Sequence, residues 1–483
     1  MIPDSDRTGQ DAEIGLAAEI DWGSHHREPR FGYCPPSHPR PILAACQPVT
    51  SGGLDENCIC NAHGDWTGQR RGRGPEAPAP DIAQILSQRI DTDKQGVGIA
   101  VALVDGAETS FTLHGTLAAD SAPVDENTIF EIGSITKIFT NLLLAQLVLE
   151  GRMDLDKPVS DYLPTGTDLP QYQGQTITLF DLATHSSGLP PIPPELAPAN
   201  LANPYIAYKA DNLAAFSAAY DLPRAPGTQY EYSNTGIALL GRAISHVADK
   251  PYAELVEERI LTPLGMNDTT LVPVDAARFA SGHNRMGQAV PHWDFDVFAP
   301  AGAYRSTAAD MAKFIAAASG QTDTALKPAF ELMLAGTRPA GSPNMSIGLG
   351  WMILKHPGGE IVWHNGITGG FNGFVGYERT GGKGVVVLAN QVSQTGIEDI
   401  GFHLIDPSLP LSPQPALRQQ VEIDPAVLPG YVGEYQLGPE FNLTVTTENG
   451  HLFVQASGRG RLELFPESPT TFFFQRCRCA GQL

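Results

Sequence analysis

The sequence predicts an α+β fold in which an antiparallel sheet is built from both ends of a large domain, with flanking helices and an inserted helical lobe, plus a small C-terminal β domain. Strand-like apolar segments occur at 98–113 and again at 361–388, and the chain between them has a largely helical pattern. Past a proline-rich stretch at 407–415, short β segments return. Strand material at both ends of a helical region indicates one sheet assembled from both ends.

The N-terminal segment, residues 1–80, lacks the apolar pattern that predicts that domain. It is rich in proline, arginine, glycine, aspartate and histidine and has no hydrophobic period. We therefore predict a disordered or non-native N-terminal extension. The stretch Leu43-Ala44-Ala45-Cys46 is similar to a lipoprotein cleavage box, but prolines occupy the place of the apolar run that must precede it. No signal peptide is legible, and a start codon assigned too far upstream would explain the segment equally well.

The large domain is expected at residues 81–405. Isoleucines and a leucine at 82–90 mark one face of a short helix, and the apolar run 98–104 pairs with 110–113 across an Asp-Gly turn. From Ser134 to Phe314 the pattern is mainly helical, with proline-rich loops between the helices. A cleft between the sheet and the helical lobe is where a functional site is expected. We expect the loops at 189–212 and 282–298 to border this cleft and to determine substrate choice. The returning strands are predicted at 361–364, 371–377 and 385–388.

The C-terminal part divides into a linker and a small β domain. Residues 406–420 contain the proline-rich stretch and are predicted to be the linker. Residues 421–483 contain four short strand-like segments, two of them joined by the Asn449-Gly450 turn typical of a hairpin. This β-meander ends abruptly after Phe472-Phe473-Phe474, and the following Arg476-Cys477-Arg478-Cys479 does not continue the pattern.

Charge and cysteine content exclude several functions. The 483-residue chain has a formal net charge of −22, which argues against binding nucleic acid or an anionic membrane surface. The sequence has no apolar run long enough to span a bilayer. The six cysteines lie near the two ends, and their spacing fits no usual zinc ligand set, so we expect neither a metal nor a cofactor.

The most informative motif is Ser134-Ile135-Thr136-Lys137, at the predicted start of a helix. A serine and a lysine three residues apart place a hydroxyl and an amine on the same helical face. A lysine whose pKa is lowered by its surroundings can accept the proton of a serine nucleophile. Gly133 leaves room for a sharp entry turn, and the N–H groups of the first turn point toward developing negative charge.

The second motif is Tyr232-Ser233-Asn234. A phenol held beside an ammonium can exist partly as phenolate, so Tyr232 could carry a proton to a leaving group. The amide of Asn234 could donate to a substrate carbonyl and also hold the Lys137 side chain. The alternative for Tyr232 is that it simply packs.

The third motif runs from His364 through Asn365, Gly366 and Ile367 and is followed by two further glycines. A glycine-rich edge strand allows a substrate backbone to lie alongside it and leaves an N–H group for an oxyanion. We therefore include His364, Gly366 and Ile367 among the candidate substrate-binding residues.

In this order the three motifs resemble the serine penicillin-recognising hydrolases: class C β-lactamases, the DD-peptidases and D-aminopeptidases of that branch, and their esterase relatives. The resemblance extends from Asp81 to Gln391. Two further sequence segments, 177–189 and 301–311, also resemble the family. His185 lies in the first of them, and we expect it to fix the loop through a hydrogen bond rather than to act in catalysis.

The resemblance implies a role for each motif residue. Ser134 would be the nucleophile and Lys137 its base, and Tyr232 would share proton transfer and activate water in deacylation. Asn234 would bind the substrate amide, and the backbone N–H groups of Ser134 and Ile367 would form the oxyanion hole. The substrate would be a small molecule or peptide: a β-lactam, a D-amino-acid peptide or an ester. The family suggests a periplasmic or secreted location, and the C-terminal β unit resembles small barrel domains appended to some of its peptidases.

The third motif departs from class C β-lactamases, which usually have Lys-Thr-Gly where this chain has His364-Asn365-Gly366. A histidine there resembles certain DD-carboxypeptidases and D-aminopeptidases. In those carboxypeptidases, threonines after the histidine help to hold a free carboxylate, but here Asn365 and Ile367 occupy these positions. Endopeptidase, aminopeptidase and esterase activities are therefore open. A different class of function, a penicillin-binding sensor that is acylated but hardly turns over, is disfavoured because Lys137 and Tyr232 are both present.

Overall fold

A computed structural model describes residues 18–21, 30–33, 80–196, 202–272, 275–393, 395–413, 420–438, 441–456 and 461–474. The chain divides into two units. The larger comprises residues 73–415, and the smaller combines residues 1–72 with 416–483. Most of the predicted N-terminal extension lies outside the described residues, with two short strands as the exception.

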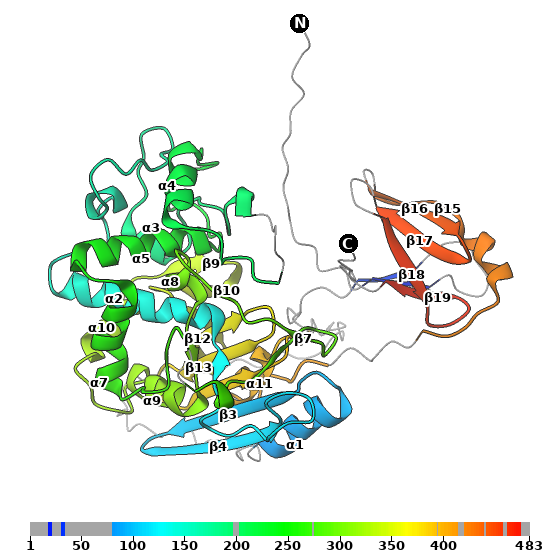
Figure 1. The fold of residues 1–483 in the computed structure, drawn as a ribbon, viewed down its shortest axis with the longest axis horizontal. Coiled ribbons are helices and arrows are strands. Elements are labelled where there is room, and N and C mark those ends of the chain that lie inside the picture. The colour runs from blue at the N-terminus through cyan, green and yellow to red at the C-terminus, as the bar shows by residue number, and fades with distance from the viewer. Residues whose placement is uncertain are drawn as a thin grey trace, which may run out of the picture. The chain divides into compact units, whose positions relative to one another are not determined.

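Eight of the described strands of the larger unit form one antiparallel sheet (Figure 1). Their order is β4-β3-β14-β13-β12-β11-β10-β9. The other four form two separate pairs: β5 (Phe130–Glu131) with β8 (Arg305–Ser306), and β6 (Gly282–His283) with β7 (Ala289–Val290). Strand β3 from the start of the unit pairs with β14 from its end, so that Val101 lies opposite Val387. The expected sheet built from both ends of the domain is thus confirmed. The strands are β3 (Gly98–Asp105), β4 (Glu108–Gly115), β9 (Arg338–Ala340), β10 (Ser342–Ile347), β11 (Met352–His356), β12 (Gly359–Ile367), β13 (Asn372–Glu378) and β14 (Gly384–Ala389).

Both faces of this sheet are covered, because neighbouring residues of its central strands belong to different cores. In β14, Val386 and Leu388 pack into the main core with α2 and α9, whereas Val385 and Val387 pack with α1 and α11 on the opposite face. A strand buried on both faces is apolar at every position, as β14 is. The helices are α1 (Ile82–Ser87), α2 (Thr136–Leu149), α3 (Leu179–Ala183), α4 (Ala210–Ala219), α5 (Asn234–Ala248), α6 (Tyr252–Val256), α7 (Thr262–Leu264), α8 (Ala299–Gly302), α9 (Ala308–Ala318), α10 (Lys327–Met333) and α11 (Glu398–Ile405).

The sequence did not reveal β9, β10 and β11, which complete the far edge of the sheet. Their residues alternate irregularly, and a register shift interrupts the pairing of β9 with β10 between Ser342 and Ser346. Such a bulge breaks the two-residue period by which strands are recognised.

The smaller unit is a single antiparallel sheet in the order β15-β16-β17-β18-β19-β1-β2. Asn449 and Gly450 both have positive φ, 49° and 79°, as required for a tight turn between β16 and β17. Leu428, Val445, Leu452 and Phe472 belong to its separate core. Its strands are β1 (Ala18–Asp21), β2 (Arg30–Tyr33), β15 (Gly433–Gly438), β16 (Phe441–Glu448), β17 (His451–Ala456), β18 (Arg461–Pro466) and β19 (Thr471–Phe474).

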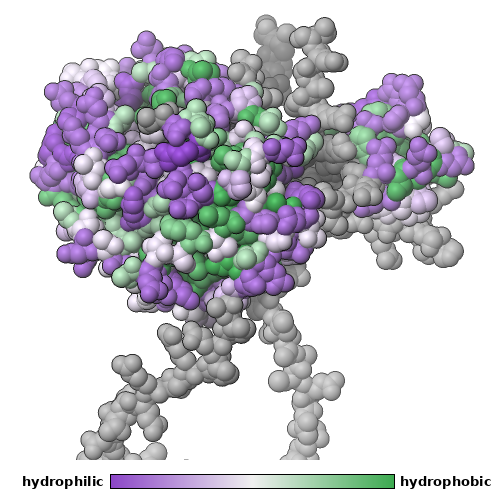
Figure 2. Space-filling view, turned by 60° about the horizontal axis from the view of Figure 1, so that its bottom comes forward, coloured by the Kyte–Doolittle hydropathy of each residue, from purple (hydrophilic) through white to green (hydrophobic). Residues whose placement is uncertain are grey.

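Hydrophilic residues cover much of the visible face of the larger unit, with hydrophobic residues between them (Figure 2). Within the described parts of the chain, every helix is too short or too polar to cross a membrane.

An ion pair between Arg89 and Asp399 fastens the segment after α1 to α11, and both side chains are buried, with exposures of 5% and 7%. Replacing Asp399 with alanine is expected to lower the free energy of unfolding by about 3 kcal/mol, because a buried guanidinium would lose its counter-charge. The half-exposed pair of Arg379 and Glu360 provides the control: Glu360→Ala should cost less than about 1 kcal/mol. Urea denaturation of both variants measures the difference, and equal losses would contradict the prediction.

Candidate active site

Ser134 and Lys137 lie where the chain turns from strand β5 (Phe130–Glu131) into helix α2. Ser134 is in a 3₁₀ turn, Gly133–Ile135, and Lys137 is in the first turn of α2. The two side chains meet as the spacing predicted: Lys137 Nζ lies 2.9 Å from Ser134 Oγ, within hydrogen-bond distance.

Two glycines allow strand β12 to approach this turn closely. Gly133 has a φ of +50°, and a Cβ on it would lie 2.9 Å from both the N and the O of Ile367. A Cβ on Gly366 would lie 1.9 Å from the carbonyl oxygen of Ile132 and 3.1 Å from the N of Ser134. The backbone N–H groups of the 3₁₀ turn and of β12 can therefore lie side by side only because both glycines lack a side chain.

Replacing Gly366 with alanine is expected to lower kcat/KM about 100-fold. The added methyl group must push β12 away from Ser134, and this displaces the backbone N–H group of Ile367 from its position beside the nucleophile. Gly430→Ala is the control, since a Cβ at Gly430 meets nothing within 4 Å. Steady-state kinetics with any substrate that the wild-type protein turns over measures the effect. Unchanged kinetics in a folded G366A protein would refute the close-approach argument.

Lys137 is fully buried, with 0% of its surface exposed. Burial lowers the pKa of its amine well below the usual range, because the charged form is poorly solvated there. Its Nζ also donates a hydrogen bond of 2.6 Å to the carbonyl oxygen of Ala301 on α8. That contact leaves the amine aimed at Ser134, and a lowered pKa makes it suitable as a proton acceptor.

Tyr232 lies beside this pair, with Lys137 Nζ 4.8 Å from the centre of its ring. Burial raises the pKa of its phenol, while a hydrogen bond with Ser134 acts in the opposite direction. The resting side chain is therefore a neutral phenol, not the partial phenolate considered from the sequence. Tyr232 can donate or relay a proton, whereas Lys137 is the better base.

His185 packs against Tyr232, with ring centres 4.4 Å apart. Its Nδ1 accepts a 3.1 Å hydrogen bond from the backbone N–H of Ser233. The bond joins His185 to the residue after Tyr232, which agrees with the loop-fixing role expected from the sequence. Burial lowers the pKa of His185 well below its usual value, and the neighbouring Lys137 acts in the same direction, so the ring is neutral.

Asn234 begins helix α5, which Ser233 caps by accepting the N–H of Gly236. We expected its amide to hold Lys137, but Asn234 Nδ2 instead donates to the hydroxyl of Tyr205 at 3.4 Å. Its Oδ1 is buried and has no partner among the described residues. A substrate N–H group is a suitable partner for that oxygen.

His364 lies on β12, near enough to Lys137 for the two charges to interact. Burial and Lys137 together lower the pKa of His364 to about 3, so its ring is neutral at neutral pH. Its Nδ1 lies 2.5 Å from the carbonyl oxygen of Asn365 and must carry the proton, because a carbonyl can only accept. His364 thus presents a neutral ring, not a cation, where the family's β-lactamases usually have lysine.

Asn365 and Ile367 differ in their surroundings from His364. The Asn365 side chain donates a 2.6 Å hydrogen bond to Glu398 of α11, which covers the opposite face of the sheet from α2. Ile367 is 46% exposed and lines the same cavity as Ser134. In this structure Asn365 therefore supports the strand, and Ile367 adds apolar surface to the cleft.

The cavity beside Ser134 reveals residues that sequence reasoning missed. Gly133, Ser134, Asn234 and Ile367 line it together with Tyr205, Trp293, Phe295, Phe298, Ala301 and Gly302. The aromatic residues come from the loops 189–212 and 282–298, which the sequence indicated as cleft loops without showing which of their side chains enter the site. Ala301 lies in the segment 301–311, which resembled the family. A side-chain motif gives no sign that its backbone carbonyl oxygen accepts a hydrogen bond from Lys137.

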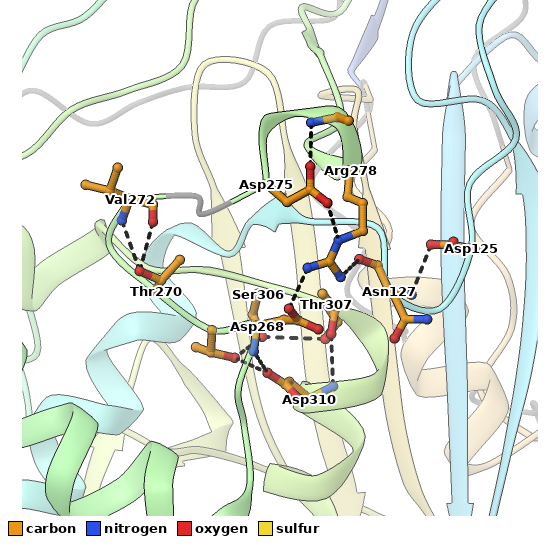
Figure 3. A network of polar contacts seen from close by, with 12 residues as sticks. Asp125, Asn127, Asp268, Thr270, Val272, Asp275, Arg278, Ser306, Thr307 and Asp310 are labelled. Carbon is orange, nitrogen blue, oxygen red and sulfur yellow. Dashed lines mark hydrogen bonds and ion pairs between the residues drawn. The ribbon is translucent and has the colours of Figure 1, made fainter.

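A polar network around Asp268 and Asp310 reaches Ser306 (Figure 3). Asp310 Oδ2 accepts hydrogen bonds from the N–H of Asp268 and the hydroxyl of Thr269, which also contacts Ser306. Arg278 joins the network through Asp268 at 2.6 Å. These contacts fix strand β8 (Arg305–Ser306), which pairs with β5 immediately before the Ser134 turn.

The chain has recognisable relatives among known proteins. It is 34% identical over 197 residues to the D-alanyl-D-alanine-carboxypeptidase/endopeptidase AmpH of Escherichia coli K12, a match that covers 40% of this chain and 50% of that protein. It is 28% identical over 384 residues to penicillin-binding protein 4* of Bacillus subtilis, covering 74% and 82% of the two chains. The chain thus spans about half the length of AmpH and most of the second relative.

Solved structures agree with the sequence relatives. The octameric penicillin-binding protein homologue from Pyrococcus abyssi superposes with a TM-score of 0.60 at 25% identity, over 80% of this chain and 91% of that one. A class C beta lactamase from Rhodobacter sphaeroides gives a TM-score of 0.56 at 25% identity, over 65% and 94%. The family model described as Beta-lactamase matches residues 82–406, the whole sheet and helical lobe described above. The chain therefore belongs to the beta-lactamase family.

Proposed function

We propose that this enzyme works through an acyl-enzyme at Ser134 and that its substrates are D-amino-acid peptides or β-lactams. The observation that carries the proposal is the 2.9 Å contact between Ser134 Oγ and the buried amine of Lys137. A hydroxyl beside an amine of lowered pKa is the arrangement that activates a serine nucleophile.

In the proposed acylation step, Ser134 Oγ bonds to the substrate carbonyl carbon while its proton passes to Lys137 Nζ. The carbonyl oxygen becomes an oxyanion, which the N–H groups of Ser134 and Ile367 stabilise by about 3 to 4 kcal/mol per donor. The proton then passes by way of the Tyr232 hydroxyl to the leaving nitrogen or oxygen as its bond to the carbonyl carbon breaks. In deacylation the same groups take a proton from a water as its oxygen bonds to the acyl carbon. They return this proton to Ser134 Oγ as the bond between Oγ and the acyl carbon breaks and the acid product leaves.

Carboxylic ester hydrolysis is a second candidate, favoured by the neutral ring of His364. A substrate with a free carboxylate beside the scissile bond needs a cation there, and the pKa of about 3 leaves His364 uncharged. Internal peptide bonds and esters carry no such carboxylate, whereas penicillins and nitrocefin carry one next to the lactam nitrogen and are therefore expected to be the poorer substrates. Among peptides, we therefore infer that an endopeptidase substrate is preferred over one ending in D-Ala-D-Ala.

The test compares nitrocefin, p-nitrophenyl butyrate, a D-Ala-D-Ala peptide and its C-terminal amide in one assay. Acylation and turnover of at least one of them, with the amide favoured over the free acid, is the expected result. A covalent penicillin adduct detected by mass spectrometry, without turnover of any substrate, would make the protein a sensor and overturn the proposal.

Replacing His364 with lysine is expected to improve kcat/KM for the free D-Ala-D-Ala acid about tenfold relative to its amide, since the new ammonium can pair with the carboxylate. His364→Gln, which adds no charge, is the matched control. An equal change in both variants would show that charge at this position does not select the substrate.

A further inference from the structure

We propose that His185 is a positioning residue that holds the Tyr232 phenol in place for proton transfer to the leaving group, and that it thereby determines how basic a leaving group the enzyme can expel. The inference rests on the proposed function, in which Tyr232 relays a proton from Lys137. It adds a residue to that proton path and names the leaving groups for which the path is needed, alkoxides and amines.

His185 is bonded to the chain on both sides of Tyr232. Its backbone carbonyl oxygen accepts the N–H of Glu231 at 2.7 Å, and its ring Nδ1 accepts the N–H of Ser233 at 3.1 Å. Its ring also packs on that of Tyr232, with centres 4.4 Å apart and planes inclined by 39°. A single residue therefore holds the backbone before Tyr232, the backbone after it and the aromatic ring itself.

The remaining contacts of Tyr232 that matter for catalysis are with the reacting groups. Its hydroxyl shares a hydrogen bond with Ser134, and Lys137 Nζ lies 4.8 Å from the centre of its ring. Misplacement of a catalytic group by about 1 Å can lower a rate about 100-fold. The packing of His185 against the phenol ring is therefore expected to affect the proton transfer and not only the stability of the loop.

Three requirements meet at position 185. The backbone φ is +52°, in the left-handed region that residues with a side chain seldom adopt. The side chain must also offer an acceptor to Ser233 and cover one face of Tyr232. Asparagine would meet the first two requirements, because it tolerates this backbone and carries an acceptor oxygen. Only the contact with Tyr232 requires an aromatic ring.

The imidazole of His185 is held at a cost in free energy. Because Nδ1 accepts a hydrogen bond, Nε2 carries the proton of the neutral ring. This Nε2 is buried and has no hydrogen-bond partner within the part of the chain that the structure describes. A buried donor without a partner and an uncommon backbone conformation both oppose folding, and such features are concentrated at functional sites.

The segment that carries His185 is itself anchored. The Ser186 carbonyl oxygen accepts the N–H of Gly227 at 2.7 Å, and the Ser186 hydroxyl contacts the guanidinium of Arg338 on β9. Arg338 Nη1 also lies 2.5 Å from the carboxylate of Asp181. The ring of His185 therefore rests on a segment that is tied to the edge of the large sheet, so it can keep the phenol in a fixed position.

The test compares two esters of N-acetyl-D-alanine, which share an acyl group and differ in the leaving group. p-Nitrophenolate is a stable anion that leaves without a proton, whereas ethoxide must take one as its bond to the carbonyl carbon breaks. His185→Gly accepts the left-handed backbone but removes the ring. It is expected to lower kcat/KM about 30-fold for the ethyl ester and less than about threefold for the p-nitrophenyl ester. The shared deacylation step does not enter kcat/KM once acylation is irreversible.

Three further variants complete the comparison. His185→Asn keeps an acceptor for Ser233 and should bring the ethyl ester back to within about tenfold of wild type. Tyr232→Phe should show the same dependence on the leaving group as His185→Gly. His283→Asn is the matched control, because His283 is also buried and its Nδ1 lies 2.9 Å from the carbonyl oxygen of Asn390. Any loss in this control should be equal for the two esters. Thermal denaturation shows which variants are folded, and His185→Asn carries the test if His185→Gly is not.

The outcomes separate this inference from the proposed function. If Tyr232→Phe loses the ethyl ester selectively while the folded His185 variants lose both esters equally, the proton path stands and the positioning role of His185 is refuted. If Tyr232→Phe shows no dependence on the leaving group, the proposed proton path fails and this inference fails with it. Turnover of neither ester by the wild-type protein would contradict the proposed acyl-enzyme itself.

Discussion

Replacing Ser134 with alanine is expected to lower kcat/KM for every substrate by at least about 1000-fold, because no acyl-enzyme can form without the hydroxyl. The fold should be retained, since removing one oxygen leaves the Lys137 contact with Ala301 intact. The measurement is steady-state turnover of the best substrate, together with mass spectrometry of protein incubated with penicillin.

Wild-type protein should gain the mass of the acyl group and Ser134→Ala should not. Thr140→Ala is a useful control, because Thr140 is buried one turn further along α2 and bonds to the carbonyl of Pro300 at 2.7 Å. Its loss removes a buried hydroxyl from α2, the helix that follows the Ser134 turn, without removing the proposed nucleophile. Retention of full turnover or of the acyl adduct by Ser134→Ala would show that Ser134 is not the nucleophile.

Replacing Lys137 with methionine is expected to abolish turnover to a similar degree and, at neutral pH, to make the protein more stable. The side chains have similar lengths, but methionine needs no solvation of a charge. Lys137 is fully buried, and burial lowers its pKa well below the usual value. The unfolded chain keeps an ordinary lysine, so between the folded and unfolded pKa values the unfolded state binds more protons.

The sign of the pH dependence follows from this difference. In wild-type protein the Lys137 contribution makes the free energy of unfolding rise with pH through that window, by at most about 1.4 kcal/mol per pH unit. The contribution is lost as pH falls toward the lowered folded pKa. The stability gain of Lys137→Met over wild type should therefore be largest at low pH and shrink toward pH 10, as measured by urea denaturation at several pH values. A gain that is independent of pH would contradict a lowered pKa for Lys137.

The parts of the site that the sequence predicts are those set by local spacing. Ser134 and Lys137 meet because three residues make about one helical turn. The strands β3 and β14 are recognised because their apolar runs are buried on both faces. The glycines around Ile367 were expected to leave room for a substrate backbone, but in the structure Gly366 lies against the backbone of Ile132 in the same chain. Strand β12 is also an inner strand, between β11 and β13, and not an edge strand.

The parts that it does not predict depend on contacts between distant segments. Tyr205 and Trp293 come together only after two irregular loops are fixed by Asn203, Asp294 and Glu131. The charge of His364 also depends on its surroundings, since burial beside Lys137 and not residue type sets its pKa. A sequence motif indicates which residue types are present at a site. Their pKa values, and the cavity left between them, depend on how the folded chain packs around them.

The pairing of β3 with β14 has a consequence for folding during synthesis on the ribosome. Gly98 at the start of β3 donates its N–H to Asn390, a residue 292 positions later in the chain. At a synthesis rate of roughly 5 to 20 residues per second, β14 is synthesised about 15 to 60 seconds after the hairpin formed by β3 and β4. During that time its unpaired edge is open to other chains. Protection of this hairpin by a chaperone during synthesis would therefore be expected to govern the yield of active enzyme.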